Sequence, residues 1–160
     1  MAAIPYLERP VFPDITTRYT AVSIRTQRHP PDVASFIRAK TDFFAGIWVD
    51  SDALDYRFRL ELLAPSLTQT PRVIRNIMGR PQDPAKLLEA LRTGTPLLML
   101  YGDEDQLLDC ERTKQLMEPH CAAMTVHIVR GAGHAPFYEH RGEFVAEVLR
   151  FVRRAVKTSR

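Results

Sequence analysis

Two loops of this 160-residue chain carry side chains suited to acid–base chemistry. The first loop, residues 102–105 (Gly-Asp-Glu-Asp), places carboxylates directly after an apolar run. The second loop, residues 131–139, places His134 among small residues that let the backbone turn sharply. A carboxylate on one ring nitrogen fixes the tautomer of a histidine and stabilises the imidazolium that forms when the other nitrogen takes a proton. An acid of the first loop and His134 therefore form a candidate general-base pair.

The two loops meet only if the segments before them are neighbouring parallel strands. Residues 96–101 form a continuous apolar run of strand length, and residues 124–130 are rich in β-branched side chains. A helix is predicted over about residues 111–118, and an apolar stripe predicts an amphipathic C-terminal helix from about Gly142. The order strand, helix, strand, helix is typical of an α/β sheet with helices on its faces. Ligands bind such sheets at the carboxyl ends of the strands, where both loops lie.

The first part of the chain has a different pattern, in which prolines separate short helical segments. Helices are predicted after Asp32, a candidate N-cap, and from Pro71 and Pro84. Another apolar stripe, over residues 54–63, predicts a helix that ends before Pro65. We therefore divide the chain into a helical segment, residues 1–93, and an α/β segment, residues 94–160.

The α/β segment resembles the C-terminal part of the α/β-hydrolase superfamily. Members carry an apolar strand, then Gly-x-x-Asp, and about 25 to 30 residues later Gly-x-Gly-His-x-Pro, with a glutamate three residues after the proline. Here Gly102 and Asp105 match the first motif, and Gly131, Gly133, His134, Pro136 and Glu139 match the second. The resemblance covers roughly residues 94–157. It implies that Asp105 is the acid of a catalytic triad and His134 its general base, and that Asp103 is the less suitable acid.

The nucleophile of that superfamily lies on a strand-turn-helix elbow, Gly-x-Ser-x-Gly, earlier in the chain than the acid and the histidine. None of the serines has glycines two residues to either side; they are Ser23, Ser35, Ser51, Ser66 and Ser159. An elbow of this form with Asp or Cys is also absent before Asp105. The resemblance then implies that residues 1–93 correspond to a helical lid, and that the first strands of the fold are not encoded here. The expected fold is a partial α/β-hydrolase fold, with a helical lid followed by a βαβα piece with parallel strands.

Three interpretations of function stay open. The chain is an α/β-hydrolase homologue acting on a small apolar substrate with an ester, lactone, epoxide or related bond. Alternatively, it is a non-catalytic hydrolase-like binding or interaction module, or a truncated gene model of a full hydrolase. A two-stranded sheet leaves an unpaired inner edge, so we also expect a homo-oligomer or a missing partner at that edge.

Composition limits the other classes of protein. With 45% hydrophobic and 26% charged residues, the chain is expected to be globular. No run of about 18 apolar residues predicts a membrane span, and the N-terminus lacks the features of a secretory signal. We therefore expect a cytoplasmic protein with Cys110 and Cys121 as reduced thiols.

The net charge of +3 comes from scattered basic residues, which argues against a nucleic-acid partner. A basic group in the last helix is interpreted as a solvated face; it comprises Arg150, Arg153, Arg154, Lys157 and Arg160.

The remaining candidates carry weaker signals. An apolar substrate pocket lined by Trp48, Phe43 and Phe44 is an alternative to core packing, which is the favoured interpretation. Cys110 is expected to be a thiol at the start of a helix, and His127 a packed imidazole within a strand. The other histidines, His29, His120 and His140, lack ligand spacing, so we predict neither a metal site nor a cofactor.

Overall fold

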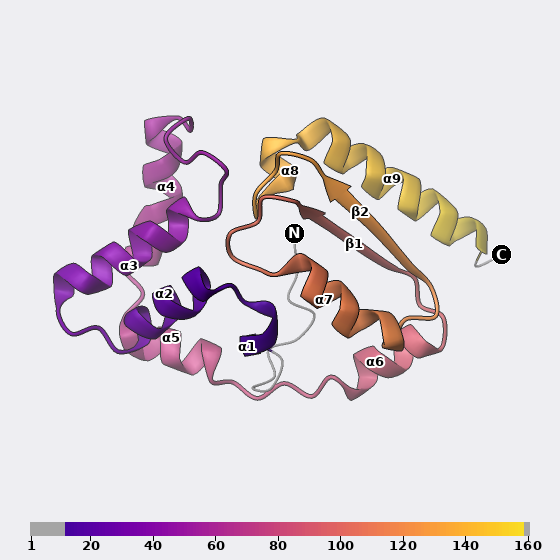
Figure 1. Ribbon diagram of the computed structural model, residues 1–160, viewed down its shortest axis with the longest axis horizontal. Coiled ribbons are helices and arrows are strands. Elements are labelled where there is room, and N and C mark those ends of the chain that lie inside the picture. The colour runs from indigo at the N-terminus through magenta and orange to yellow at the C-terminus, as the bar shows by residue number, and fades with distance from the viewer. Residues whose placement is uncertain (1–11, 159–160) are drawn as a thin grey trace.

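The computed structural model describes residues 12–158, with a helical segment followed by an α/β segment (Figure 1). The helices of the first segment are α1 (Phe12–Ile15), α2 (Arg18–Arg28), α3 (Val33–Ala45), α4 (Tyr56–Leu67), α5 (Pro71–Met78) and α6 (Ala85–Arg92). The second segment consists of β1 (Leu97–Gly102), α7 (Cys110–Met117), the 3-10 helix η1 (Glu118–His120), β2 (Met124–Val129), α8 (Pro136–Glu139) and α9 (Arg141–Thr158). None of the helices within residues 12–158 is both long and apolar enough to cross a membrane.

Strands β1 and β2 are parallel, and their register pairs Leu97 with Met124 and Gly102 with Val129. Side chains alternate between the two faces of the sheet. On one face Leu98 and Leu100 pack with the α9 residues Phe144 and Val148, as part of a cluster around Val129 and Ala132. On the other face Met99 and Tyr101 pack with Leu108 and Cys110, at the start of α7. The sheet therefore lies between α9 and α7, as Figure 1 shows, and the predicted α/β arrangement with parallel strands is confirmed.

Local capping explains where several helices begin. The Asp32 side chain accepts a hydrogen bond from the Ser35 N–H at 2.7 Å, and α3 starts directly after it. Helix α5 starts at Pro71, with the Thr70 hydroxyl as its cap. The predicted starts at these two helices are confirmed.

The helix predicted over residues 54–63 corresponds to α4. Its predicted end before Pro65 is wrong, because α4 continues to Leu67. Proline removes a single backbone donor, and here it lies in the last turn of the helix. Nearby hydroxyl groups bind the carbonyl groups of that turn: Ser66 Oγ donates to Leu63 O at 2.8 Å, and Thr68 Oγ1 donates to Pro65 O at 2.8 Å. The helix therefore continues past Pro65 to Leu67, and hydroxyl groups bind two of the carbonyl groups in its last turns.

Helix α2, which the apolar spacing does not predict, contacts the loop that follows β1. Its Thr20 hydroxyl donates to Leu107 O at 2.7 Å, and the Thr17 N–H donates to the same carbonyl group at 3.2 Å. Two residues further on, the Asp109 N–H donates to Ile15 O at 2.8 Å, and Ile15 is fully buried. The helical segment thus holds the loop after β1 in place.

Candidate functional site

Asp105 and His134 lie in the loops that follow β1 and β2, at the carboxyl ends of the two parallel strands. His134 Nδ1 is 2.9 Å from Asp105 Oδ2. The Asp105 side chain is 2% exposed, whereas the His134 side chain is 24% exposed. The structure therefore brings together the two residues singled out by sequence, with the carboxylate inside and the imidazole toward the surface. Their catalytic roles remain predictions.

The second carboxylate oxygen of Asp105 is also satisfied. Asp105 Oδ1 accepts hydrogen bonds from the Leu107 N–H at 2.8 Å and the Leu108 N–H at 3.1 Å. Burial raises the pKa of this carboxyl group, but the hydrogen bond and charge of His134 and the two N–H groups outweigh burial and lower the pKa overall. Asp105 is therefore a buried carboxylate that stays ionised at neutral pH.

This contact assigns the tautomer of His134. An ionised carboxylate is only an acceptor, so Nδ1 carries the proton and donates it to Asp105. Nε2 is then the basic nitrogen, and no described residue forms a hydrogen bond with it. Because His134 is partly exposed, Nε2 is free to accept a proton from a bound molecule.

Asp103 is the second candidate acid in the loop after β1. It holds the backbone of residues 131–139, which carry His134 and are called the histidine loop. Its Oδ1 accepts from the Gly131 N–H at 2.7 Å, and its Oδ2 accepts from Arg130 Nη1 at 3.1 Å. The hydrogen bond from Arg130 and that from Gly131 lower the pKa of Asp103. Gly131 has a φ of +68°, a left-handed conformation that glycine adopts without strain. Asp103 thus shapes the loop of His134 and does not contact the imidazole.

Glu139 joins the histidine loop to a turn of the helical segment. Its Oε2 accepts from the Gly133 N–H at 2.8 Å, and its Oε1 accepts from the Val49 N–H at 2.8 Å. In the same place the His134 N–H donates to Ile47 O at 2.9 Å. A Cβ atom on Gly133 would lie 3.0 Å from Ile47 O, so glycine permits this close approach. The backbone of residues 47–49 therefore supports the backbone that carries His134.

Several solved structures have this arrangement of elements. A candidate aryl esterase from Burkholderia cenocepacia aligns with a TM-score of 0.76 at 19% identity, over 96% of this chain and 53% of its own. An esterase from a Rhodococcus species aligns with a TM-score of 0.73 at 23% identity, over 91% of this chain and 51% of its own. This chain carries part of an α/β-hydrolase fold.

A bromoperoxidase from Bacillus anthracis has the same partial likeness, with a TM-score of 0.63 at 21% identity over 85% of this chain and 49% of its own. The chain thus spans about half the length of the α/β-hydrolase structures it matches. No family model and no curated protein matches its sequence. At these identities the likeness establishes the fold alone, so activity has to be argued from the residues of the site.

An aromatic cluster lies beside the histidine loop of the α/β segment. Trp48 is 4% exposed and packs with Phe44 and Ala135. Tyr138 stacks on Phe58 with ring centroids 4.7 Å apart and meets Trp48 edge-on at 5.2 Å. These contacts favour core packing for Trp48, which is the favoured sequence interpretation. Contact with this core positions the segment that follows His134.

Cys110 contacts the site without the properties of a nucleophile. Its Sγ lies 3.6 Å from Asp105 Oδ2, and α7 begins at this residue, as expected from the sequence. Burial and the nearby Asp105 carboxylate raise the pKa of the thiol strongly, so it stays protonated. A protonated thiol donates a weak hydrogen bond to Asp105 and does not attack a substrate.

The other histidines have structural partners or lie away from the pair. His127 Nε2 is 2.7 Å from Glu143 Oε1, which joins β2 to α9. His140 Nε2 is 3.2 Å from Gly131 O, within the histidine loop. Within residues 12–158 no three His, Cys, Asp or Glu side chains are grouped to hold a metal ion. The sequence motifs singled out Glu139, but no sequence signal pointed to its contact with Val49, since the two lie far apart in the chain.

Proposed function

We propose that this chain carries the acid–base half of a hydrolytic site, with His134 as general base and Asp105 as the residue that orients it. The observation that supports the proposal is the 2.9 Å contact between His134 Nδ1 and the buried Asp105 carboxylate. The proposed substrates are small apolar molecules with an ester or related acyl bond, since esterases share this partial fold.

The proposed reaction uses the proton that Nε2 accepts. Nε2 takes the proton of an attacking hydroxyl group or water as the new C–O bond forms at the acyl carbon. The imidazolium then faces the Asp105 carboxylate, which stabilises its charge and keeps the ring in place. The same proton is returned from Nε2 to the leaving oxygen as the ester C–O bond breaks.

This sequence contains no Gly-x-Ser-x-Gly elbow, so no residue of the chain is assigned as nucleophile or oxyanion donor. With water as the nucleophile, His134 supplies only general-base assistance, of about 10²- to 10⁴-fold. Oxyanion stabilisation is worth a further factor of about 10² to 10³ in enzymes that have it. We therefore expect slow hydrolysis of activated esters by this chain.

The test compares hydrolysis of an activated short-chain aryl ester by the wild type, His134→Gln and His29→Gln. His29 is an exposed histidine at the end of α2, so its replacement controls for imidazole groups that act nonspecifically. The rate should fall to the uncatalysed background in His134→Gln and stay unchanged in His29→Gln. Equal rates in all three proteins would refute a catalytic role and favour the binding-module interpretation.

A further inference from the structure

Four donors of this chain surround the Asp105 carboxylate, and the Cys110 thiol is the fourth. An ionised carboxylate has about four acceptor sites, two on each oxygen. The Leu107 and Leu108 N–H groups fill those of Oδ1, and His134 Nδ1 fills one of Oδ2 at 2.9 Å. Cys110 Sγ lies 3.6 Å from the same Oδ2, which is within hydrogen-bond distance for the larger sulfur atom. Because the Asp105 side chain is 2% exposed, the thiol fills a site that solvent hardly reaches.

The thiol has a second acceptor within reach. Cys110 Sγ is 3.7 Å from Leu108 O, and a thiol has one proton to donate. A charged carboxylate is a stronger acceptor than a neutral carbonyl group, so donation to Asp105 is favoured. Burial and the nearby Asp105 carboxylate raise the pKa of the thiol, which therefore keeps its proton and remains a donor. The contact is thus a hydrogen bond from Cys110 to Asp105.

Packing fixes the thiol in this position. Cys110 is 8% exposed and packs with Tyr101 and Leu108. It is the first residue of α7, and the Asp109 side chain caps that helix. The Asp105 carboxylate is therefore contacted from α7 as well as from the histidine loop.

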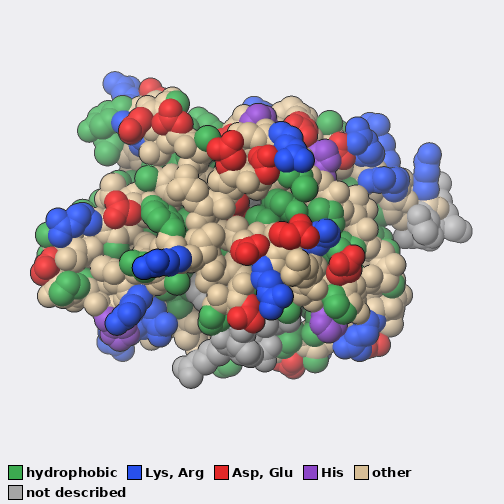
Figure 2. Space-filling view, viewed as in Figure 1, with side chains coloured by type: hydrophobic (Ala, Val, Ile, Leu, Met, Phe, Trp, Pro, Cys, Tyr) green, Lys and Arg blue, Asp and Glu red, His purple; other side chains and the backbone are tan. Residues whose placement is uncertain are grey.

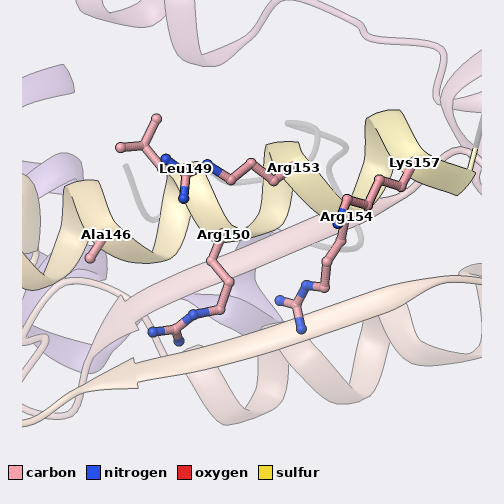
Figure 3. A pocket seen from close by; sticks show the side chains of 6 residues that line it. All are labelled: Ala146, Leu149, Arg150, Arg153, Arg154 and Lys157. Carbon is pink, nitrogen blue, oxygen red and sulfur yellow. The ribbon is translucent and has the colours of Figure 1, made fainter.

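The basic group of α9 acts on this contact only weakly. It lies on the second half of the helix, lines a hollow of about 460 Å³ and comprises Arg150, Arg153, Arg154 and Lys157. Basic side chains gather at this end of the helix in Figure 2, and Arg150 and Arg154 extend to one side of it in Figure 3. At about 1.5 Å per residue, the group lies about 13 to 24 Å along α9 from its start beside the histidine loop, beyond the Debye length of about 10 Å. The donors on Oδ2 therefore have the larger influence on how strongly Asp105 holds the imidazole.

We propose that Cys110 is a positioning residue of the His134–Asp105 pair, whose thiol holds the carboxylate and moderates its hydrogen bond with His134. Two donors on one oxygen share its negative charge, so each bond is weaker than it is alone. A stronger donor at position 110 should weaken the bond from His134, and loss of the donor should strengthen it. The inference concerns the contact itself, and only its effect on hydrolysis rests on the proposed function.

The first test measures the downfield Nδ1–H proton resonance of His134 in the wild type, Cys110→Ser and Cys110→Ala. A hydroxyl group is a stronger donor than a thiol, so Cys110→Ser should move the resonance upfield. Cys110→Ala removes the donor and should move it downfield, toward a stronger bond with Asp105. A residue that only fills space would leave the resonance in place in Cys110→Ser, which nearly keeps the shape of the side chain. Cys121→Ser changes the other free thiol and is the matched control, in which the resonance should not move.

The S–H stretching band in the Raman spectrum identifies the acceptor without a change at position 110. Its frequency falls as the thiol donates a stronger hydrogen bond, and in a Cys121→Ser background Cys110 alone contributes the band. Asp105→Asn replaces the charged acceptor by a neutral one and should raise the frequency. Glu104→Gln, at an exposed position of the same loop, should leave it unchanged. A band that Asp105→Asn does not move would assign the proton to Leu108 O and overturn the proposal, as would a His134 resonance that neither Cys110 variant moves.

Ester hydrolysis separates this inference from the proposed function. A hydrogen bond of thiol strength corresponds to a factor of about two to five in rate. Cys110→Ser and Cys110→Ala should therefore stay within that factor of the wild type, whereas His134→Gln should fall to the background. If the wild type itself does not hydrolyse the ester, the proposed function fails, and the resonance and the S–H band still decide the role of Cys110. A folded Cys110→Ser protein as inactive as His134→Gln would overturn the positioning role.

Discussion

Asp105 Oδ2 lies 2.9 Å from His134 Nδ1, although the two residues are 29 positions apart in the chain. The register of the sheet produces this contact. Gly102 and Val129 are paired at the ends of β1 and β2, so both loops begin at the same level of the sheet. Asp105 and His134 each follow that level within a few residues. The geometry of a general-base pair thus follows from parallel pairing and two short loops.

Replacing Asp105 by asparagine should remove most of the base function of His134. An amide can donate to Nδ1, which favours the tautomer with its proton on Nε2 and leaves no basic nitrogen facing a substrate. We expect loss of most of the general-base assistance of about 10²- to 10⁴-fold in ester hydrolysis. The downfield proton resonance of the Nδ1–H group should also disappear from the NMR spectrum. Asp103→Asn should keep that resonance, because Asp103 bonds Arg130 and Gly131.

The lowered pKa of Asp105 predicts how stability depends on pH. A carboxyl group whose folded-state pKa is below its unfolded value, about 3.9, binds fewer protons when folded. Its contribution to the free energy of unfolding is therefore complete above that value and is lost as the pH falls through the folded-state pKa. Urea unfolding between about pH 7 and 3 should show a steeper loss of stability in the wild type than in Asp105→Asn. An equally steep loss in both proteins would contradict the assignment, and Asp14→Asn, at an exposed position in α1, is the control.

Much of the α/β segment could be predicted because its signals are local. An apolar run marks β1, β-branched residues mark β2, and the two loop motifs place Asp105 and His134. Helix α2 escaped prediction because its buried side is polar, with Thr20, Ser23 and Gln27 facing inward. Ser23 Oγ donates to Ala39 O at 2.8 Å, a contact that satisfies the hydroxyl group and that apolar periodicity cannot show.

The support of the site depends on contacts between distant residues, which sequence patterns do not contain. The Leu107 and Leu108 N–H groups bind Asp105 in a local turn, but distant residues of α1 and α2 hold that turn in place, through the contacts of Ile15 and Thr20. Ile47 and Val49 reach the histidine loop only because α3 ends beside it. A motif identifies candidate catalytic residues, whereas the contacts that position them depend on the tertiary fold.

Gly102 should tolerate no side chain. A Cβ atom there would lie 2.0 Å from Ala132 O and 2.4 Å from Gly133 O, so the backbone of these residues would have to move. We expect Gly102→Ala to lower the free energy of unfolding by about 1–3 kcal/mol or more, as overpacking does. Gly142→Ala is the matched control, since a Cβ there meets nothing within 4 Å and the residue lies in α9. That variant should be stabilised by about 0.5–1 kcal/mol. Denaturant melts of both variants measure the difference, and a Gly102→Ala protein as stable as the wild type would contradict the close contact.

Glu139 should stabilise the chain through both of its carboxylate oxygens. Each accepts a backbone N–H, from Gly133 and Val49, and hydrogen bonds to charged groups contribute about 1.5–3 kcal/mol each. Glu139→Ala leaves two N–H groups without an acceptor, so we expect a loss of about 2–4 kcal/mol in the free energy of unfolding. Glu139→Gln keeps one acceptor oxygen and should lose about half as much.

Exposed Glu104 offers the control for the loss of a negative charge, and Glu104→Ala should change stability by less than about 0.5 kcal/mol. Amide exchange distinguishes a local bridge from a general loss of stability. In Glu139→Ala the Val49 and Gly133 amides should exchange faster even under conditions where the rest of the protein stays folded, because their acceptor has gone. The His127 and Val129 amides in β2 should keep the exchange rates of the wild type under the same conditions. If all of these amides instead exchanged faster together, Glu139 would act through global stability, and its bridge between the histidine loop and residues 47–49 would have no separate role.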